Sequence, residues 1–239
     1  MEELPILFED ESLLILDKPP GIVVNRAPSV KVETVQDFTQ KKIHVLDTTS
    51  KDSDFFVRSG IVHRIDKETS GILVVAKTEE AFIAMQNAFK ERSVKKTYCA
   101  IVHGIMVPRE GEIHAPVGRM TWNREHFGIV PGGKDAVTRY TVQGNWFLSH
   151  GEKFSFVLLY PQTGRTHQIR VHLKYLNHPI LGDYLYAGRK TARDDRLWAP
   201  RVMLHAKEIS FTHPKTGAIL TIHAPMPRDM MEIVPINIV

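Results

Sequence analysis

The sequence has little cysteine and no long hydrophobic run. It contains one cysteine, Cys99, in 239 residues. A single thiol cannot form an internal disulfide, and structural zinc sites usually draw on several cysteines and histidines. The longest apolar runs, such as residues 71–76, fall far short of the ~18 residues that a membrane-spanning helix needs. We therefore expect no disulfide, no membrane partner and a reducing, cytoplasmic environment.

Several motifs of nucleotide and hydrolase chemistry are also missing. The chain has no Walker sequence, paired-glycine dinucleotide loop, Cys-x-x-Cys pair or nucleophile elbow. Its first segment, MEELPILFEDE, is acidic where a secretory signal peptide would be basic. These absences argue against a nucleotide cofactor, serine hydrolysis and export.

Positive charge is scarce in total and unevenly distributed. The chain has 31 Lys and Arg against 27 Asp and Glu, a net charge of +4. Residues 1–50 carry five basic and nine acidic side chains, net −4, so residues 51–239 carry 26 and 18, net +8. Basic residues gather in 90–96 (KERSVKK) and 189–201. Such clusters can neutralise nucleic-acid phosphates, or can simply be solvated faces that aid solubility.

The pattern of apolar residues predicts one α+β domain over residues 1–239. Hydrophobic residues make up 43% of the chain, enough for a sizeable core, and no linker or repeat interrupts it. Apolar runs around Lys18-Pro19-Pro20-Gly21 predict strand, turn and strand, and helical spacing follows Thr78. A second helix carries Ile169, with Thr166 as a candidate N-cap. Further strands are expected at 97–103, 137–142, 154–160, 204–211 and 218–223. Many strands without βαβ alternation favour a mixed, mainly antiparallel sheet flanked by helices and loops.

The densest polar cluster is HRIDKETSG at residues 63–71, directly before the apolar run GILVVAK. Asp66 lies between Arg64 and Lys67, whose positive charges favour an ionised carboxylate, available as a nucleophile or base. The same letters also fit a polar turn in which Gly71 supplies an unusual backbone conformation. On composition alone, the turn is the more common reading.

A second polar cluster, YPQTGRTHQIRVH, covers residues 160–172. Arg165 and Arg170 carry guanidinium groups suited to hold a carboxylate or phosphate, although two surface arginines would look the same. His167 and His172 are five residues apart, about 140° around a helix at ~100° per residue, so we expect no metal site. Tyr98, in KKTYCAIVHG, could stack on a base or join the core, and Cys99 is expected to be a small buried hydrophobe.

Together these segments resemble the RluA family of RNA pseudouridine synthases. HRIDKETSG, KKTYCAIVHG, TGRTHQIRVHLKYLNHPILGDYLY and LHAKEISFTHPKTG occur in this order, and the likeness runs from KPPG at 18–21 to APMP at 224–227. The combination of HR-hydrophobic-D-x-x-TSG with GRTHQIR is highly specific. The resemblance implies a pseudouridine synthase fold with a central catalytic cleft.

The resemblance also implies an activity: isomerisation of specific uridines in RNA, with no cofactor or metal. It makes Asp66 the catalytic carboxylate, which either attacks C1′ or removes a ribose proton. It makes Tyr98 the active-site tyrosine that stacks on the target base and Arg170 the basic partner of the aspartate. Arg64 matches the arginine that fills the space left by the flipped nucleotide. The other expected RNA contacts are His63, Lys67, Lys95, Lys96, Arg165 and His167.

The sequence departs from the family pattern in two places. IVVNRAPSV follows KPPG where many relatives carry a His-Pro-Gly-like turn, and Ile65 replaces the usual leucine. The catalytic pattern begins within the first twenty residues, so we expect a stand-alone, monomeric catalytic domain without the small RNA-binding domain of many relatives. RNA recognition would then rest on the basic surface of the catalytic domain.

Three functional hypotheses remain from the sequence. The first is a pseudouridine synthase acting on large-subunit ribosomal RNA, which we favour, or on transfer RNA. The second is a catalytically silent RNA-binding protein on the same scaffold. The third, an unrelated hydrolase using Asp66, would need a second carboxylate or a metal cluster at a suitable spacing.

Overall fold

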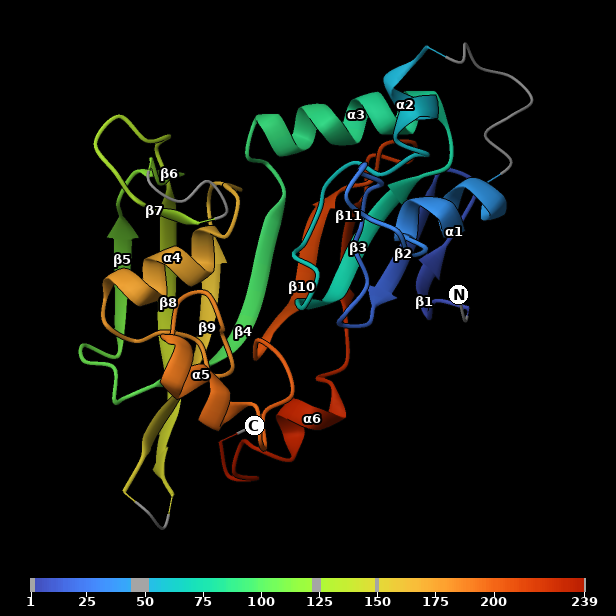
Figure 1. Cartoon of the computed structure of the whole chain (residues 1–239). Coiled ribbons are helices and arrows are strands. Elements are labelled where there is room, and N and C mark those ends of the chain that lie inside the picture. The colour runs from blue at the N-terminus through green and yellow to red at the C-terminus, as the bar shows by residue number, and fades with distance from the viewer. Residues whose placement is uncertain (1–2, 44–51, 122–125, 149–150, 239) are drawn as a thin grey trace. The chain divides into compact units, whose positions relative to one another are not determined.

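The computed structural model describes residues 3–43, 52–121, 126–148 and 151–238, and it divides into two compact units (Figure 1). Unit 1 consists of residues 1–95 and 206–225, and unit 2 of residues 96–205 and 226–239. The chain therefore passes from one unit to the other three times. The single domain expected from the sequence stays a prediction.

Unit 1 is built on an antiparallel meander extended by a C-terminal hairpin. Its strands follow the order β1-β2-β3-β10, and β11 pairs with β10. The pairs β1–β2, β2–β3 and β10–β11 are antiparallel. The elements are β1 (Ile6–Glu9), β2 (Leu13–Lys18), α1 (Val35–Lys42), α2 (Asp54–Val57), β3 (Ser70–Ala76), α3 (Glu79–Lys90), β10 (Leu204–Thr212), whose first two residues belong to unit 2, and β11 (Ile219–His223).

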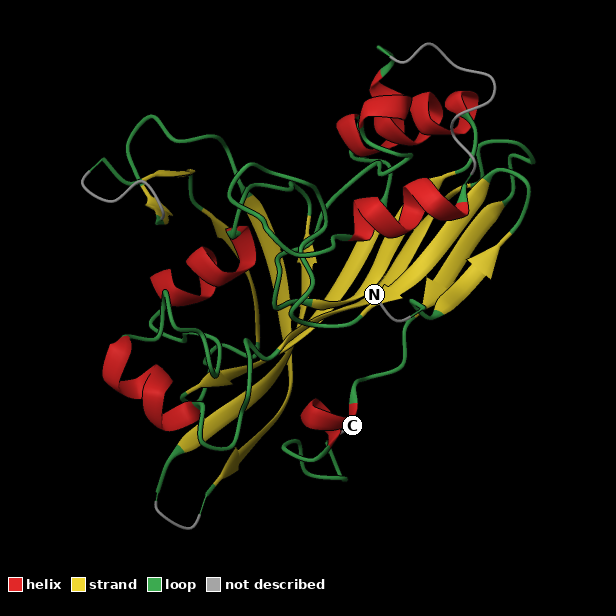
Figure 2. Cartoon of the chain, turned by 45° about the vertical axis from the view of Figure 1, so that its right-hand side comes forward, coloured by secondary structure: helices red, strands yellow, loops and turns green. Residues whose placement is uncertain are grey.

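Helix α3 forms where the sequence predicts a helix and packs on the sheet of unit 1 (Figure 2). The Thr78 hydroxyl accepts a hydrogen bond from the Ala81 amide at 3.2 Å, and two glutamates follow in the first turn. Phe82 and Met85 are 1% exposed and share a core cluster with residues of β2 and β3. Burial of this apolar face stabilises the helix more than its intrinsic propensity does.

Unit 2 contains four antiparallel strands in the order β4-β9-β8-β5. A separate two-stranded sheet pairs β6 with β7. The elements are β4 (Lys95–His103), whose first residue belongs to unit 1, β5 (Glu110–His114), β6 (Val117–Arg119), β7 (Phe127–Ile129), β8 (Val137–Phe147), β9 (Lys153–Pro161), α4 (Gln168–Tyr175), α5 (Arg189–Asp195) and α6 (Arg228–Met231). A large apolar cluster of β4, β8, β9 and α4 residues forms its core.

Two local expectations are wrong. Residues 22–24 form no strand after the KPPG turn, because the amides of Val35 and Gln36 instead hold the Val23 and Val24 carbonyls against the start of α1. Thr166 is not the N-cap of the second helix. Residue His167 takes that place in the left-handed conformation, with φ 55°, and makes no side-chain capping bond.

Candidate active site

Asp66 lies in the loop that leads into β3. Its carbonyl accepts a hydrogen bond from the Thr69 amide at 3.1 Å, which closes a turn of four residues. Ile65 on one side is 6% exposed and anchors the loop, while Arg64 and Lys67 are exposed. The Asp66 side chain itself is partly buried. The loop thus presents a carboxylate between two exposed cations.

A buried lysine in the KPPG turn connects that turn to the Asp66 loop. Lys18 is fully buried, and its Nζ donates to the carbonyls of Pro19 at 2.8 Å, Ile22 at 3.1 Å and Lys67 at 3.1 Å. The Gly21 amide donates to the same Lys67 carbonyl at 2.8 Å. From the sequence alone, Lys18 is expected only to be part of a turn. The charge of a buried ammonium requires such acceptors, so this lysine fixes the backbone next to Asp66.

His63 belongs to the framework of the loop. Its Nε2 accepts a hydrogen bond from the Val74 amide at 2.9 Å, so the neutral ring carries its proton on Nδ1. The ring stacks on Phe89 of α3, with the ring centroids 4.7 Å apart. These two contacts tie the start of the loop to β3 and α3, and the predicted RNA contact of His63 stays a prediction.

Tyr98 lies on β4, opposite Leu159 of β9, and is partly buried against the core of unit 2. Alternate residues of a strand share a face, so Lys96 and Tyr98 lie on one face and Cys99 on the other. Cys99 is fully buried, which confirms its interpretation as a small hydrophobe. Burial lowers the pKa of Lys96 to about 8.

A buried glutamine organises the turn that precedes α4. Gln168 Nε2 donates to the Val137 carbonyl and the Thr138 hydroxyl, both at 3.0 Å. Its Oε1 accepts from the Thr163 hydroxyl at 2.7 Å and from the Arg165 amide at 3.0 Å. The sequence gives no local signal for this role, because the partners on β8 are about thirty residues away.

Arg165 and Arg170 differ sharply in their surroundings. Arg165 is partly buried, and its Nε donates to the Asp135 carbonyl at 3.0 Å. Arg170 is 6% exposed and binds the fully buried Asp183 through two hydrogen bonds. The alternative of two surface arginines is therefore wrong for Arg170. Its side chain is part of the interior of unit 2.

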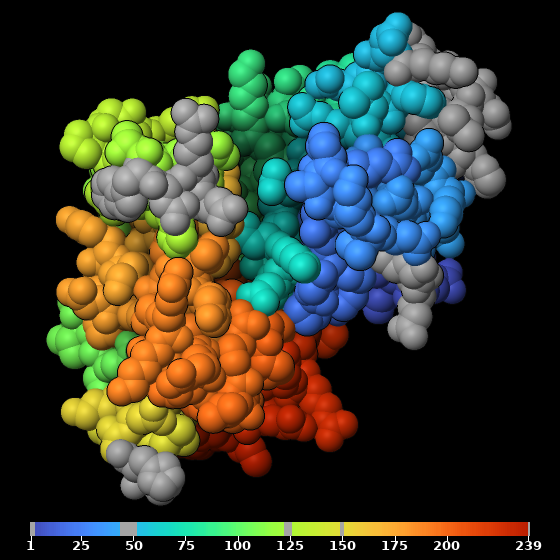
Figure 3. Space-filling model, viewed as in Figure 1, coloured from blue at the N-terminus to red at the C-terminus, as the bar shows by residue number. Residues whose placement is uncertain are grey.

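The basic cluster at 189–201 contains two structural arginines. Arg201 is 4% exposed and forms a two-bond pair with Asp229, while Arg196 donates to the carbonyls of Gly182 and Pro200. The exposed cations of the two clusters are Lys90, Arg92, Lys95, Arg189, Lys190 and Arg193. Residues of α5 lie at the surface in Figure 3.

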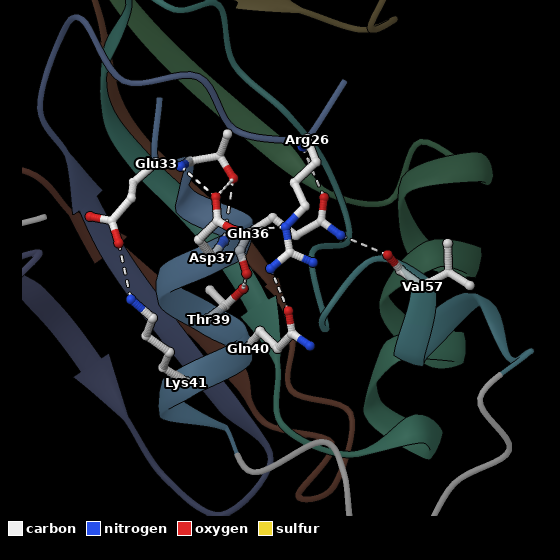
Figure 4. Close-up of polar contacts among 9 residues, drawn as sticks. Arg26, Glu33, Gln36, Asp37, Thr39, Gln40, Lys41 and Val57 are labelled. Atoms are coloured by element: carbon white, nitrogen blue, oxygen red, sulfur yellow. Dashed lines mark hydrogen bonds and ion pairs between the residues drawn. The ribbon is translucent and has the colours of Figure 1, made fainter. Parts of the chain in front are cut away.

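A third polar group surrounds a hollow of about 490 Å³ lined by residues between 26 and 41 (Figure 4). Arg26 pairs with Asp37 at 2.7 Å and also bonds Gln40. The Thr34 side chain, followed by the Arg26 contact, lowers the pKa of Asp37 to about 2. Lys41 pairs with Glu33 at 3.0 Å. These contacts hold the loop after KPPG onto α1.

No cluster of histidine, cysteine or acidic residues suitable for a metal ion occurs among the described residues. His172 is buried, with its ring between the Thr138 hydroxyl and the Ala115 carbonyl, each 3.0 Å away. Burial lowers its pKa, so its ring is neutral near pH 7. None of the described helices is long and apolar enough to cross a membrane.

The predicted catalytic residues are divided between the units. Asp66 and Arg64 belong to unit 1, and Tyr98 and Arg170 belong to unit 2. Within unit 2, the structure brings Arg170 and His167 into one network through Tyr186. The assembly of Asp66, Tyr98 and Arg170 in a common catalytic cleft stays a prediction.

Comparison with known proteins decides the family. A family model described as RNA pseudouridylate synthase matches residues 12–175, a range that includes Asp66, Tyr98 and Arg170. The chain belongs to this family. The family, α+β fold class and enzyme class expected from the sequence are thereby confirmed, and RNA is the substrate class of the family.

Individual relatives cover nearly the whole chain. An uncharacterized RNA pseudouridine synthase of Bacillus subtilis is 38% identical over 97% of this chain and 72% of its own length. The ribosomal large subunit pseudouridine synthase D of Neisseria meningitidis serogroup A is 37% identical over 98% of this chain and 61% of its own. The structure of human RNA pseudouridylate synthase domain containing 1 matches with a TM-score of 0.73 at 30% identity, over 94% of this chain and 84% of that one.

Proposed function

We propose that this chain isomerises uridine to pseudouridine within RNA and that Asp66 is its catalytic carboxylate. The observation that carries the proposal is the family match across residues 12–175 together with the loop that holds Asp66 between Arg64 and Lys67 at the start of β3. In the reaction the bond from N1 to C1′ breaks and a bond from C5 to C1′ forms. C5 loses its proton and N1 gains one, so no electron donor or acceptor takes part.

The roles of the side chains follow from this bond exchange. The uracil must leave its stack before it can turn over, at a cost of a few kcal/mol. Arg64, exposed beside Asp66, would fill the vacated space, and Tyr98 would hold the flipped base by stacking. Asp66 would attack C1′ or remove a ribose proton, with its orientation set by Arg170. The rigid attachment of Arg170 to Asp183 supports a positioning role for this guanidinium.

We further propose large-subunit ribosomal RNA as the target, in the cytoplasm. Relatives named ribosomal large subunit pseudouridine synthase D from several bacteria are 36% to 39% identical to this chain. The chain spans 61% to 72% of the length of the curated relatives reported above.

The target is tested with RNA labelled with tritium at C5 of uridine, because isomerisation releases this atom to water. We expect release from large-subunit ribosomal RNA transcripts and at least about tenfold less from a transfer RNA pool. Faster release from transfer RNA would make that pool the target. Release from neither, despite binding to both, would favour a silent RNA-binding protein.

Lys96 gives a prediction about pH. With its pKa lowered to about 8, the ammonium is charged below pH 8 and neutral above it. If it meets an RNA phosphate, RNA affinity falls as pH rises from 7 to 9, and Lys96→Met abolishes this fall. The free energy of unfolding of the RNA-free protein changes in the opposite direction and rises with pH between about 8 and 10.5. In this range Lys96 is protonated in the unfolded state but neutral in the folded state.

Lys95→Met is the matched control for this experiment, because Lys95 is the exposed neighbour of Lys96 on the same strand. Filter binding at pH 7 and pH 9 measures affinity. We expect Lys95→Met to weaken binding at both pH values and to reduce the slope against log salt by about 1. If the RNA affinity of Lys96→Met still falls between pH 7 and pH 9 as in the wild type, Lys96 does not contact the RNA.

A further inference from the structure

Arg170 is held by a carboxylate that lies entirely inside unit 2. Its Nε donates to Asp183 Oδ2 at 2.7 Å, and its Nη2 donates to Oδ1 at 2.9 Å. Asp183 is 0% exposed and Arg170 is 6% exposed. Two parallel bonds between a guanidinium and a carboxylate fix the plane of the guanidinium as well as its position. The direction of every other Arg170 donor is therefore set by Asp183.

Asp183 is itself fixed by its own backbone. Its Oδ1 also accepts hydrogen bonds from the amides of Leu185 at 3.0 Å and Tyr186 at 3.2 Å. Its amide donates to the Ile180 carbonyl at 3.1 Å. The Asp183 carboxylate thus accepts four hydrogen bonds, two from Arg170 and two from backbone amides, which hold it in one orientation.

Tyr186 completes the arrangement on the face of the guanidinium. Its ring centroid lies 5.0 Å from Arg170 Cζ, within the range of a cation–π contact. Its hydroxyl lies 2.9 Å from His167 Nδ1 and accepts a hydrogen bond from the Phe127 amide at 3.2 Å. The Tyr186 hydroxyl therefore bridges the Phe127 backbone and the His167 ring. The TGRTHQIR and LGDYLY segments are thereby joined around Arg170.

We propose that Asp183 is a positioning residue that acts on the reaction through Arg170, an inference that rests on the proposed function. A buried ion pair often contributes little net stability compared with apolar residues of similar volume. A pair with four hydrogen bonds on the carboxylate and an aromatic ring on the guanidinium is instead suited to orient a charge. In the proposed reaction Arg170 is the partner of Asp66, and its orientation matters because a displacement of about 1 Å can cost on the order of 10²-fold in rate.

The first test is Asp183→Asn, which keeps the shape of the side chain but places an amide where Arg170 needs an acceptor. We expect kcat for tritium release to fall on the order of 10²-fold, while KM and the Kd for RNA stay within about twofold. Asp183→Glu keeps the charge but moves the carboxylate by one methylene. A positioning role predicts that this variant also loses kcat, and it gives an answer if the asparagine variant does not fold.

Asp229→Asn is the matched control. Asp229 binds Arg201 with the same two-bond geometry, at 2.6 Å and 2.9 Å, and Arg201 is 4% exposed. This variant should lower the melting temperature and leave kcat per folded protein unchanged. Equal kcat in wild type and in both Asp183 variants would overturn the inference. Absence of tritium release by the wild-type chain would instead contradict the proposed function itself.

Discussion

Asp66→Asn is expected to abolish pseudouridine formation while leaving RNA binding intact. The amide that replaces the carboxylate has no negative oxygen to attack C1′ and no basicity to remove a ribose proton. Both open mechanisms therefore fail in this variant. The loss should exceed about 10⁴-fold, as for other enzymes deprived of an essential nucleophile or base.

RNA binding should survive because it depends on other groups. Phosphate contacts dominate affinity for nucleic acids, and we expect the exposed cations of the chain to supply them. Removing one negative charge between Arg64 and Lys67 cannot weaken such contacts. The Kd for RNA should stay within about twofold of wild type at a fixed salt concentration.

Glu68→Gln is the control for Asp66→Asn, since it removes the same charge two residues further along the same loop. Tritium release at C5 and filter binding are measured for all three proteins. We expect Glu68→Gln to retain activity within about threefold, because it leaves the Asp66 carboxylate in place. Undiminished release by Asp66→Asn would exclude Asp66 as the catalytic carboxylate, whichever mechanism operates.

The parts of the fold that could be predicted are those whose signals are local. Helix α3 follows from a capping threonine and apolar residues at helical spacing, and β4, β8, β9, β10 and β11 follow from runs of β-branched and aromatic residues. Helix α1 was not predicted, because its sequence, VQDFTQKK, has few apolar residues. Only the capping box between Thr34 and Asp37 marks its beginning.

The parts of the candidate site that escaped prediction depend on distant partners. Lys18 looks like a turn lysine, yet its ammonium binds a carbonyl forty-nine residues away. Arg201 looks like part of a basic surface, yet it is buried against Asp229. The sequence alone does not distinguish a charged residue that faces water from one that pairs with a buried carboxylate. Spacing therefore predicts which segments carry the chemistry, and only tertiary contacts show which side chains hold those segments in place.

Gly71→Ala is expected to destabilise the fold of unit 1 severely. Gly71 follows the Asp66 loop in β3 and has φ +104°, a conformation that L residues rarely adopt. A Cβ at this position would lie 2.3 Å from the Ala206 carbonyl oxygen, with the Ala206 backbone carbon and nitrogen at 2.9 Å. Because these are backbone atoms of β10, relief requires the strand itself to move.

Gly217→Ala separates the two causes of this damage. Gly217 also has a left-handed backbone, φ +72°, but a Cβ there meets nothing within 4 Å. The Gly217→Ala substitution should lower the free energy of unfolding only by the conformational strain, about 1–2 kcal/mol. Gly71→Ala should cost more than about 4 kcal/mol, because steric overlap with the β10 backbone adds to that strain. Urea denaturation of both variants measures the difference.

The activity of a folded Gly71→Ala protein carries further information. Ser70 and Gly71 join β3 directly to the turn that Asp66 and Thr69 close, so a displaced strand carries the carboxylate with it. We expect tritium release to fall with stability in Gly71→Ala and to be unaffected in Gly217→Ala. Equal stability of the two variants would mean that β10 yields to the added methyl group. Close approach of the backbones would then not be the reason that glycine occupies position 71.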